Sequence, residues 1–282
     1  MKILFLGTGA AEGVPAMYCD CETCQEVRRR GEGEYHTRSQ IVVDESVGID
    51  FPPDAYYRSL RYGLELKNLE RLLITHSHMD HFYAHDFILR GYKYTKADLP
   101  DLHIYGNEEV CEVYRECTRR ELRAEVGERI HLHCVAPFQP FEFDGYTATA
   151  LIAQHSVNEQ AYVYLLEKDG KAYLHLTDTG RLPKESLQFL EKYCTEKNIM
   201  LNVVVFDCTF LFRTAGDVSR HMGLEDNMAM KARFEEAGIV NKDTMYVITH
   251  YSHNGNPLKE TLQKAEKEYG VCAAFDGMGI EV

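Results

Sequence analysis

The chain has 282 residues, of which 45% are hydrophobic, and a formal net charge of −13. The hydrophobic share is ample for a folded core, and the length allows one large domain or two small ones. The acidic balance argues against a general nucleic-acid-binding protein, because phosphate backbones require a basic surface.

The composition also bears on where the protein acts. The apolar start at residues 2–6 is too short for a secretion signal and runs straight into Gly7-Thr8-Gly9. No stretch approaches the roughly 18 apolar residues of a membrane span. The nine cysteines are an odd number, which is typical of reduced thiols or metal ligands rather than of a disulfide framework. We therefore expect a cytoplasmic protein without a membrane segment.

The first half of the chain alternates short apolar runs with polar turns. Period-two patterns predict strands, and amphipathic runs behind a capping residue predict helices. Asn107, which two glutamates follow, is a good helix N-cap. The expected strands cover residues 2–6, 40–43, 47–50 and 72–75, and the expected helices cover residues 54–62, 80–90 and 107–125.

The second half is richer in strands, with hairpin turns at Asp144-Gly145 and Asp169-Gly170. The expected strands cover residues 130–134, 141–143, 146–153, 161–167, 171–177, 203–206, 245–249 and 271–275. Helices are expected at residues 184–193, 224–237 and 258–269. Because no linker or composition break interrupts the pattern, we expect one α/β domain over residues 1–282, built of two sheets with helices outside.

The stretch Thr75-His76-Ser77-His78-Met79-Asp80-His81 places three imidazoles and a carboxylate directly after an apolar run. Alternate side chains of a strand share a face, so His76 and His78 would point the same way. A turn after them would bring Asp80 and His81 close. Imidazole nitrogen and carboxylate oxygen are ligands that suit zinc, manganese or iron. The pattern therefore predicts a metal site.

Three further metal-capable residues, His155, Asp178 and His250, stand at the ends of expected strands. Each alone could be a satisfied buried polar residue, but together with the histidine motif they form a consistent ligand set. Two divalent ions held by such residues would activate a shared water and neutralise charge on a phosphoryl group. That chemistry needs no serine or cysteine nucleophile, so we expect a hydrolase.

The histidine motif resembles the signature of the metallo-β-lactamase-fold hydrolases, and Thr177-Asp178-Thr179-Gly180 and Ile248-Thr249-His250 resemble motifs of the same family. The resemblance implies an αββα sandwich, with two mixed sheets and helices on the outer faces. It also implies a dinuclear centre of zinc or manganese, with iron as an option, in which Asp80 and Asp178 are catalytic. By resemblance, one metal would be held by His76, His78 and His155, the other by Asp80, His81 and His250, and Asp178 would bridge them.

A second metal site is predicted by the loop Cys19-Asp20-Cys21-Glu22-Thr23-Cys24. Three thiols within six residues match one flank of a structural zinc site, which needs a fourth ligand from elsewhere. The alternative is a loop of three free cytosolic thiols. Metal ligation is favoured, because exposed clustered thiols would oxidise readily.

Within the superfamily, the sequence resembles most the phosphoribosyl cyclic phosphodiesterases of the bacterial phosphonate pathway. The shared features are Gly7-Thr8-Gly9, the cysteine loop, His250-Tyr251-Ser252-His253 and Phe275-Asp276-Gly277-Met278. The resemblance implies a structural zinc held by Cys19, Cys21, Cys24 and His253. It also implies that His221, within Ser219-Arg220-His221, contacts the phosphate or acts as general acid for the leaving oxygen.

One segment departs from that family. After His81 the family has a small pair of residues with glycine, whereas this chain has the bulkier Phe82-Tyr83-Ala84-His85-Asp86. The pocket wall, and with it the substrate, is therefore expected to differ. His85 is a candidate substrate contact, with a role on a helix surface as the alternative.

The expected activity is hydrolysis of a small, cyclic phosphodiester by a metal-bridging hydroxide. Alternatives are a cofactor-biosynthesis protein resembling the pyrroloquinoline quinone pathway B protein, a tRNA 3′-processing nuclease, or another hydrolase or redox protein of the fold. The nuclease is disfavoured because Pro15 is followed by Ala16-Met17-Tyr18 instead of a basic motif. The expected partner is the small-molecule substrate, without membrane or nucleic acid. The oligomeric state is open, with a homodimer among the options.

Overall fold

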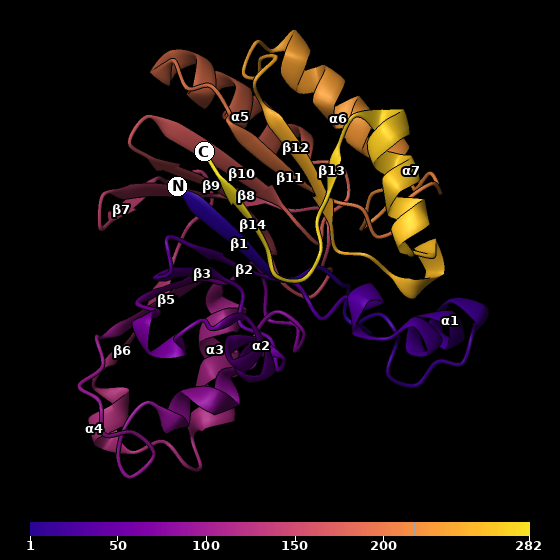
Figure 1. The fold of residues 1–282 in the computed structure, drawn as a ribbon. Helices are drawn as coiled ribbons and strands as arrows, with labels where there is room; N and C mark the ends of the chain where they lie inside the picture. The colour runs from indigo at the N-terminus through magenta and orange to yellow at the C-terminus, as the bar shows by residue number, and fades with distance from the viewer. Residues whose placement is uncertain (217) are drawn as a thin grey trace.

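The computed structural model describes residues 1–216 and 218–282, and its centre is a pair of facing seven-stranded sheets (Figure 1). The first sheet has the order β14-β1-β2-β3-β4-β5-β6. Its strands are β1 Lys2–Gly7, β2 Gln40–Val43, β3 Val47–Ile49, β4 Arg71–Leu73, β5 Leu102–Gly106, β6 Ile130–Cys134 and β14 Met278–Glu281.

The second sheet has the order β13-β12-β11-β10-β9-β8-β7. Both sheets are mixed: β3 to β6 run parallel to one another, as do β10 to β13, whereas the remaining neighbours are antiparallel. Its strands are β7 Phe141–Phe143, β8 Tyr146–Ile152, β9 Tyr162–Lys168, β10 Lys171–Leu176, β11 Val203–Asp207, β12 Met245–Thr249 and β13 Cys272–Ala273.

Helices cover the outer faces of both sheets. In Figure 1, α5, α6 and α7 lie over the second sheet, and α2 and α3 lie over the first. The helices are α1 Glu22–Arg30, α2 Ala55–Tyr62, α3 Glu108–Thr118, α4 Ala124–Gly127, α5 Lys184–Lys197, α6 Leu224–Glu236 and α7 Lys259–Tyr269. Short 3-10 helices are η1 Glu32–Glu34, η2 Leu66–Asn68, η3 Ala84–Leu89 and η4 His253–Gly255. The predicted αββα sandwich is thus confirmed, while the single domain over residues 1–282 stays a prediction.

Strand alternation divides the core into three layers. Side chains such as Phe5, Tyr164 and Val205 point between the sheets and form the central layer. The opposite faces of the same strands pack against helices, as Phe206 does against Phe234 of α6. Burial on both faces explains why strands such as β11 and β12 are nearly continuous apolar runs.

Two expected helices are shorter than predicted. The segment after His81 forms only the 3-10 helix η3, starting at Ala84, instead of a helix over residues 80–90. The helix expected over residues 107–125 ends at Thr118, whose hydroxyl donates to the Tyr114 carbonyl (2.7 Å), and a separate short helix α4 follows.

Besides the short 3-10 helices η1, η2 and η4, the sequence did not predict α1, which begins inside the cysteine loop, or the final strand β14. β14 pairs antiparallel with β1, so both ends of the described chain lie in the same sheet. The Met1 amino group donates to the Val282 carbonyl at 3.0 Å. In the described residues, no helix has the length and apolarity that a membrane crossing requires.

Candidate dinuclear metal centre

The polar residues expected at strand ends do meet at one edge of the sandwich. The histidine motif follows β4 of the first sheet, while His155, Asp178 and His250 follow β8, β10 and β12 of the second. Asp178 and His250 have left-handed backbones, with φ of 54° and 64°, and so does Asp50 after β3, with φ of 64°. Such conformations are costly for residues other than glycine and cluster at functional sites. The chain is bent here so that these side chains face inward.

The first group of converging side chains is His76, His78, His155 and Asp178, whose ligand atoms all lie within 4.8 Å of one another. His76 Nε2 lies 2.8 Å from His78 Nδ1, and His155 Nδ1 lies 3.0 Å from Asp178 Oδ1. Burial lowers the pKa of His76 well below its ordinary value, and the neighbouring His81 lowers it further. A neutral ring keeps a lone pair that can bind a cation.

The second group is Asp80, His81, Asp178 and His250, again with ligand atoms within 4.8 Å of one another. His81 Nε2 lies 3.2 Å from Asp80 Oδ2 and 3.1 Å from Asp178 Oδ2. All four residues are buried. Asp178 therefore belongs to both groups, with Oδ1 beside His155 and Oδ2 beside His81.

The orientation of these atoms is a test of whether they fit metal ions. Four buried atoms at this point make no well-aligned hydrogen bond despite their short contacts: His81 Nε2, His155 Nδ1, Asp178 Oδ1 and His250 Nε2. An unsatisfied buried polar atom lowers the stability of the fold by roughly 1–3 kcal/mol. Four such atoms at one point therefore indicate a shared ligand that satisfies them. Imidazole and carboxylate donors in this number fit divalent transition-metal ions. The residues present fit the expected metals.

Two buried acids that sequence reasoning left without a role hold these groups in place. Asp50 Oδ2 lies 2.7 Å from His81 Nδ1, and its Oδ1 accepts hydrogen bonds from Thr75 N and Oγ1, both at 2.9 Å. Asp207 Oδ2 lies 3.1 Å from His250 Nδ1. In each case a carboxylate engages one ring nitrogen and leaves the other to face the cluster, as carboxylates behind metal-bound histidines do.

His221 borders the same centre. Its Nδ1 lies 3.1 Å from Asp178 Oδ1 and 3.4 Å from Asp207 Oδ2. Burial disfavours charge on this ring, but the carboxylates of Asp178 and Asp207 outweigh it and raise the pKa of His221 to about 10. Its side chain is 27% exposed, against 4% for Asp178, so it forms part of the accessible wall of the site.

His85, the other candidate for substrate binding, is not brought into the centre. It lies exposed on η3, with its ring 5.1 Å from that of Tyr83, and it belongs to none of the groups of metal-capable residues in the described chain. Its role as a substrate contact stays a prediction.

Glu159 supports the histidine motif from the side, a role that its place in a polar loop did not indicate. Its carboxylate accepts hydrogen bonds from Ser77 Oγ (2.7 Å) and Ser77 N (3.0 Å). It also accepts one from Asn107 Nδ2 (2.8 Å), while Asn107 Oδ1 caps α3 by accepting from Val110 N. The loop between His76 and His78 is therefore tied to the start of α3.

The predicted cysteine site also assembles. Cys19, Cys21, Cys24 and His253 have ligand atoms within 4.8 Å of one another, and Cys21 Sγ lies 3.3 Å from His253 Nδ1. Hydrogen bonding with His253 lowers the pKa of Cys21 to about 6, whereas burial raises that of Cys24 to about 11. Three thiols and one imidazole have the composition of a closed structural zinc site. This cluster links the start of α1 to η4.

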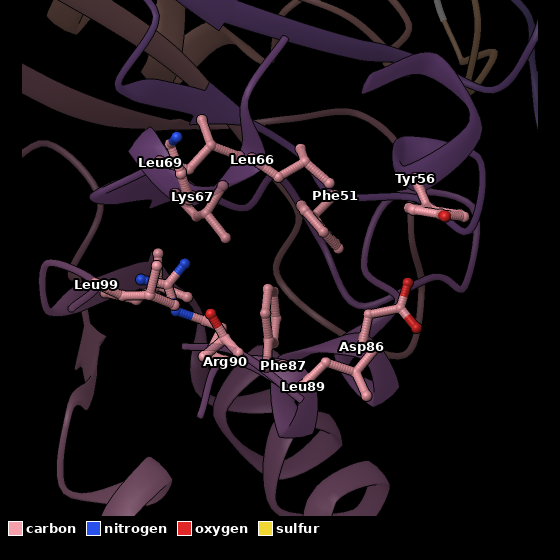
Figure 2. Close-up of a pocket in the computed structure, with 13 residues that line it drawn as sticks. Phe51, Tyr56, Leu66, Lys67, Leu69, Asp86, Phe87, Leu89, Arg90 and Leu99 are labelled. Atoms are coloured by element: carbon pink, nitrogen blue, oxygen red, sulfur yellow. The ribbon is translucent and has the colours of Figure 1, made fainter. Parts of the chain in front are cut away.

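A separate hollow is lined by Phe51 and residues around it (Figure 2). This pocket of about 330 Å³ is lined mainly by apolar side chains, including Leu69, Phe87 and Leu99. None of its 13 lining residues belongs to the two groups of the metal centre. The lining also includes Lys67, Asp86 and Arg90 but no member of the groups of metal-capable residues in the described chain, so we place the chemistry at the metal centre.

Comparison with known proteins places this centre in a family. Residues 40–251 match the family model of the beta-lactamase superfamily domain. An octanoyltransferase from Porphyromonas gingivalis is 27% identical over 162 residues, which cover 55% of this chain and 31% of that protein. A ribonuclease Z from Listeria innocua is 28% identical over 175 residues, which cover 62% of this chain and 52% of that protein. The match thus spans 31% and 52% of the length of these two relatives.

Solved structures that resemble the whole chain include the following two. A diphosphatase from the PhnP family has a TM-score of 0.70 at 22% identity, covering 100% of this chain and 97% of that chain. Zn²⁺-bound PqqB from Methylobacterium extorquens has a TM-score of 0.73 at 15% identity, with both chains covered completely. At these identities the likeness concerns the fold. Because the family model covers most of the chain, including the histidine motif, the protein belongs to the beta-lactamase superfamily and has the metallo-β-lactamase fold.

Proposed function

We propose that this protein is a metal-dependent hydrolase with a dinuclear centre that cleaves small, cyclic phosphodiesters. The observation that carries the proposal is the place of Asp178, which belongs to both groups of ligands: its Oδ1 lies 3.0 Å from His155 Nδ1, and its Oδ2 lies 3.1 Å from His81 Nε2 and 3.4 Å from His76 Nε2. A carboxylate in this position is suited to bridging two cations. The bound ions would be zinc or manganese, with iron as an option, and a further zinc would occupy the cysteine cluster.

The ions, when bound, would neutralise phosphoryl charge and lower the pKa of a water molecule. The chain's own residues supply the remaining functions. Asp80 and Asp178 hold negative charge at the centre, and Asp50 and Asp207 orient the rings of His81 and His250. The active groups are thereby fixed before substrate binds.

His221 is our candidate for protonating the leaving oxygen. Its Nδ1 faces Asp178 and Asp207, and its Nε2 has no hydrogen-bond partner among the described residues. The two carboxylates favour the protonated ring at neutral pH, which is the state a general acid needs. Asp207 is then a positioning residue that acts through His221.

A small substrate fits the charge of the molecule better than a polynucleotide does. The net charge of −13 disfavours a long phosphate backbone, whereas two cations held close together would attract a single phosphodiester locally. The ribonuclease Z relatives favour a second candidate, cleavage of transfer RNA precursors. Binding of transfer RNA at physiological salt would favour that second candidate over ours.

The proposal is tested by metal content together with hydrolysis of bis(p-nitrophenyl) phosphate. We expect about three metal ions per chain, one of them resistant to mild chelation, and diester cleavage that a chelator abolishes and added metal restores. Phosphoribosyl 1,2-cyclic phosphate is the first natural substrate to try. Full metal content without diester cleavage would contradict the proposal and point to a lactone, thioester or cofactor-pathway substrate.

Replacement of His221 by glutamine tests the general-acid role. We expect kcat to fall by about 10²–10³-fold with an alkyl leaving group, such as the alkoxide released from a cyclic ribose phosphate. With p-nitrophenolate, which leaves without protonation, the loss should be much smaller. His131→Gln, a substitution of the same kind on β6 away from the centre, is the control. Equal losses with both leaving groups would contradict proton donation by His221.

A further inference from the structure

Two cysteines outside both metal-binding regions lie against each other where α3 meets β6. Cys111 is in the first half of α3, and Cys134 is the last residue of β6. Their Sγ atoms are 2.8 Å apart, although the residues are 23 positions apart in the chain. Sulfurs in a disulfide are about 2.05 Å apart, so the two thiols need to move by less than an ångström to form the bond.

The two thiols differ in accessibility. Cys134 is exposed, whereas Cys111 is only 2% exposed. Burial, together with contact with Cys134, raises the pKa of Cys111 to about 12. A reagent from solution can therefore reach Cys134 first, and Cys111 is positioned to react with whatever is attached there. In the described chain, no similar sulfur contact is made by Cys117, Cys194, Cys208 or Cys272.

Cys134 opens into a pocket with an acidic lining. This pocket, of about 420 Å³, is also lined by Glu108, Glu109 and Glu159 and by no lysine or arginine. Glu108 and Glu109 are exposed and form no ion pair within the described chain. The local field therefore favours cationic reagents and disfavours anionic ones.

We propose that Cys111 and Cys134 form a site of reversible disulfide modification that exchanges with small cationic disulfides. The Cys134 thiolate attacks one sulfur of the small disulfide and displaces the first of its two thiolates. The Cys111 thiolate then attacks the Cys134 sulfur of this mixed disulfide and displaces the second. Overall, two protein thiols are oxidised to one disulfide, the small disulfide is reduced to two thiols, and the two protons pass to those thiols.

The Cys111–Cys134 disulfide would form beside the residues that hold the histidine motif in place. Val135 N, next to Cys134, donates to the Gly106 carbonyl (2.9 Å), and Asn107 follows as the cap of α3. Asn107 in turn holds Glu159, whose carboxylate holds Ser77. A covalent link between α3 and β6 would therefore restrict the movement of the start of α3, from which this series of hydrogen bonds extends to Ser77.

The experiment treats the metal-loaded protein with cationic cystamine, neutral 2-hydroxyethyl disulfide and anionic glutathione disulfide at low ionic strength. We expect a mass decrease of about 2 Da, which is the loss of two hydrogens, and a Cys111–Cys134 cross-link in the unreduced peptide map. Cystamine should react fastest and glutathione disulfide slowest. The cross-linked protein should melt on the order of 5 °C higher, because the bond closes a 23-residue loop of the unfolded chain.

Three variants identify the thiols. Cys134→Ser, at an exposed position, should prevent the reaction without disturbing the fold. Cys111→Ala should stop it at the mixed disulfide between Cys134 and cysteamine, which is heavier than the starting protein. Cys272→Ser, a half-buried cysteine without a sulfur neighbour, should cross-link as the unaltered protein does. A persistent mixed disulfide in the unaltered protein, a cross-link between other cysteines, or faster reaction with glutathione disulfide would overturn the proposal.

Discussion

Replacing Asp178 by asparagine is expected to remove most of the bound metal of the histidine centre and to lower diesterase turnover by at least about 10²–10³-fold. Asparagine has nearly the same shape and tolerates the left-handed backbone at this position, where φ is 54°. The substitution therefore tests the negative charge of Asp178 separately from its shape and backbone conformation. Both ligand groups lose their only common carboxylate, so both metal sites should weaken together.

The charge of Asp178 also matters before any metal binds. Burial opposes ionisation of this carboxyl, but His250, His221 and other rings around it outweigh burial and hold its pKa well below the ordinary range. The amide of the variant cannot balance these rings. We therefore expect the metal-free variant to be less stable than the metal-free parent protein, as thermal unfolding would show.

Asp169→Asn is the matched control for Asp178→Asn. Asp169 has the same left-handed backbone, with φ of 50°, and lies in the turn at the other end of the same strand, where it is exposed. It should keep full metal content and turnover. If Asp178→Asn retained both metals and near-normal turnover, the shared-carboxylate assignment would be wrong.

The ligands could be found from the sequence because their positions follow from strand geometry. His155, Asp178 and His250 follow within three residues of the ends of β8, β10 and β12, and these strands run in the same direction, so their carboxyl ends lie at one edge of the sheet. The histidine motif stands after β4 of the other sheet. When the two sheets pack face to face, the histidine motif and these three residues come together. The resemblance to the family predicted this meeting, whereas local sequence patterns alone could not.

Asp50 and Asp207 show where this reasoning stops. Both end strands as visibly as Asp178 does, yet each acts through a partner that is distant in the chain. Asp50 orients His81 from 31 residues away, and Asp207 contacts His250. Nothing in the local sequence distinguishes a ligand from the residue that orients a ligand, because the difference is a matter of tertiary distance.

The missing helical turn after the histidine motif has a tertiary cause as well. Phe51 N donates to the His81 carbonyl, and Tyr83 N donates to the Phe51 carbonyl, both at 2.7 Å. These bonds attach the chain to the residue after Asp50, and the helical pattern resumes only at Ala84. Helix propensity over residues 80–90 is thus overridden by pairing with the end of β3.

If the cysteine cluster holds a zinc ion as we propose, replacing Cys21 by serine should release it and lower the melting temperature by about 5–10 °C, while the metal content of the histidine centre and turnover stay nearly unchanged. The reason is the small core beneath α1. Its buried apolar residues are Val14, Val27 and Leu258, with Tyr35 packed against them. So small a cluster contributes little hydrophobic stabilisation, and metal-ligand bonds to η4 would contribute much of what holds this segment.

Other contacts should keep the segment from detaching completely. Arg30 of α1 donates to both carboxylate oxygens of Glu260 on α7, with both distances 2.7 Å. Exposed ion pairs of this kind contribute at most about 1 kcal/mol, so local opening should rise without global unfolding. Hydrogen exchange over residues 16–34 should accelerate in Cys21→Ser and stay unchanged in Cys117→Ser, a control on α3. A Cys21→Ser protein that melts normally but has no turnover would place the cysteine cluster in catalysis. A zinc ion that only joins α1 to η4 should affect turnover solely through the stability of the fold.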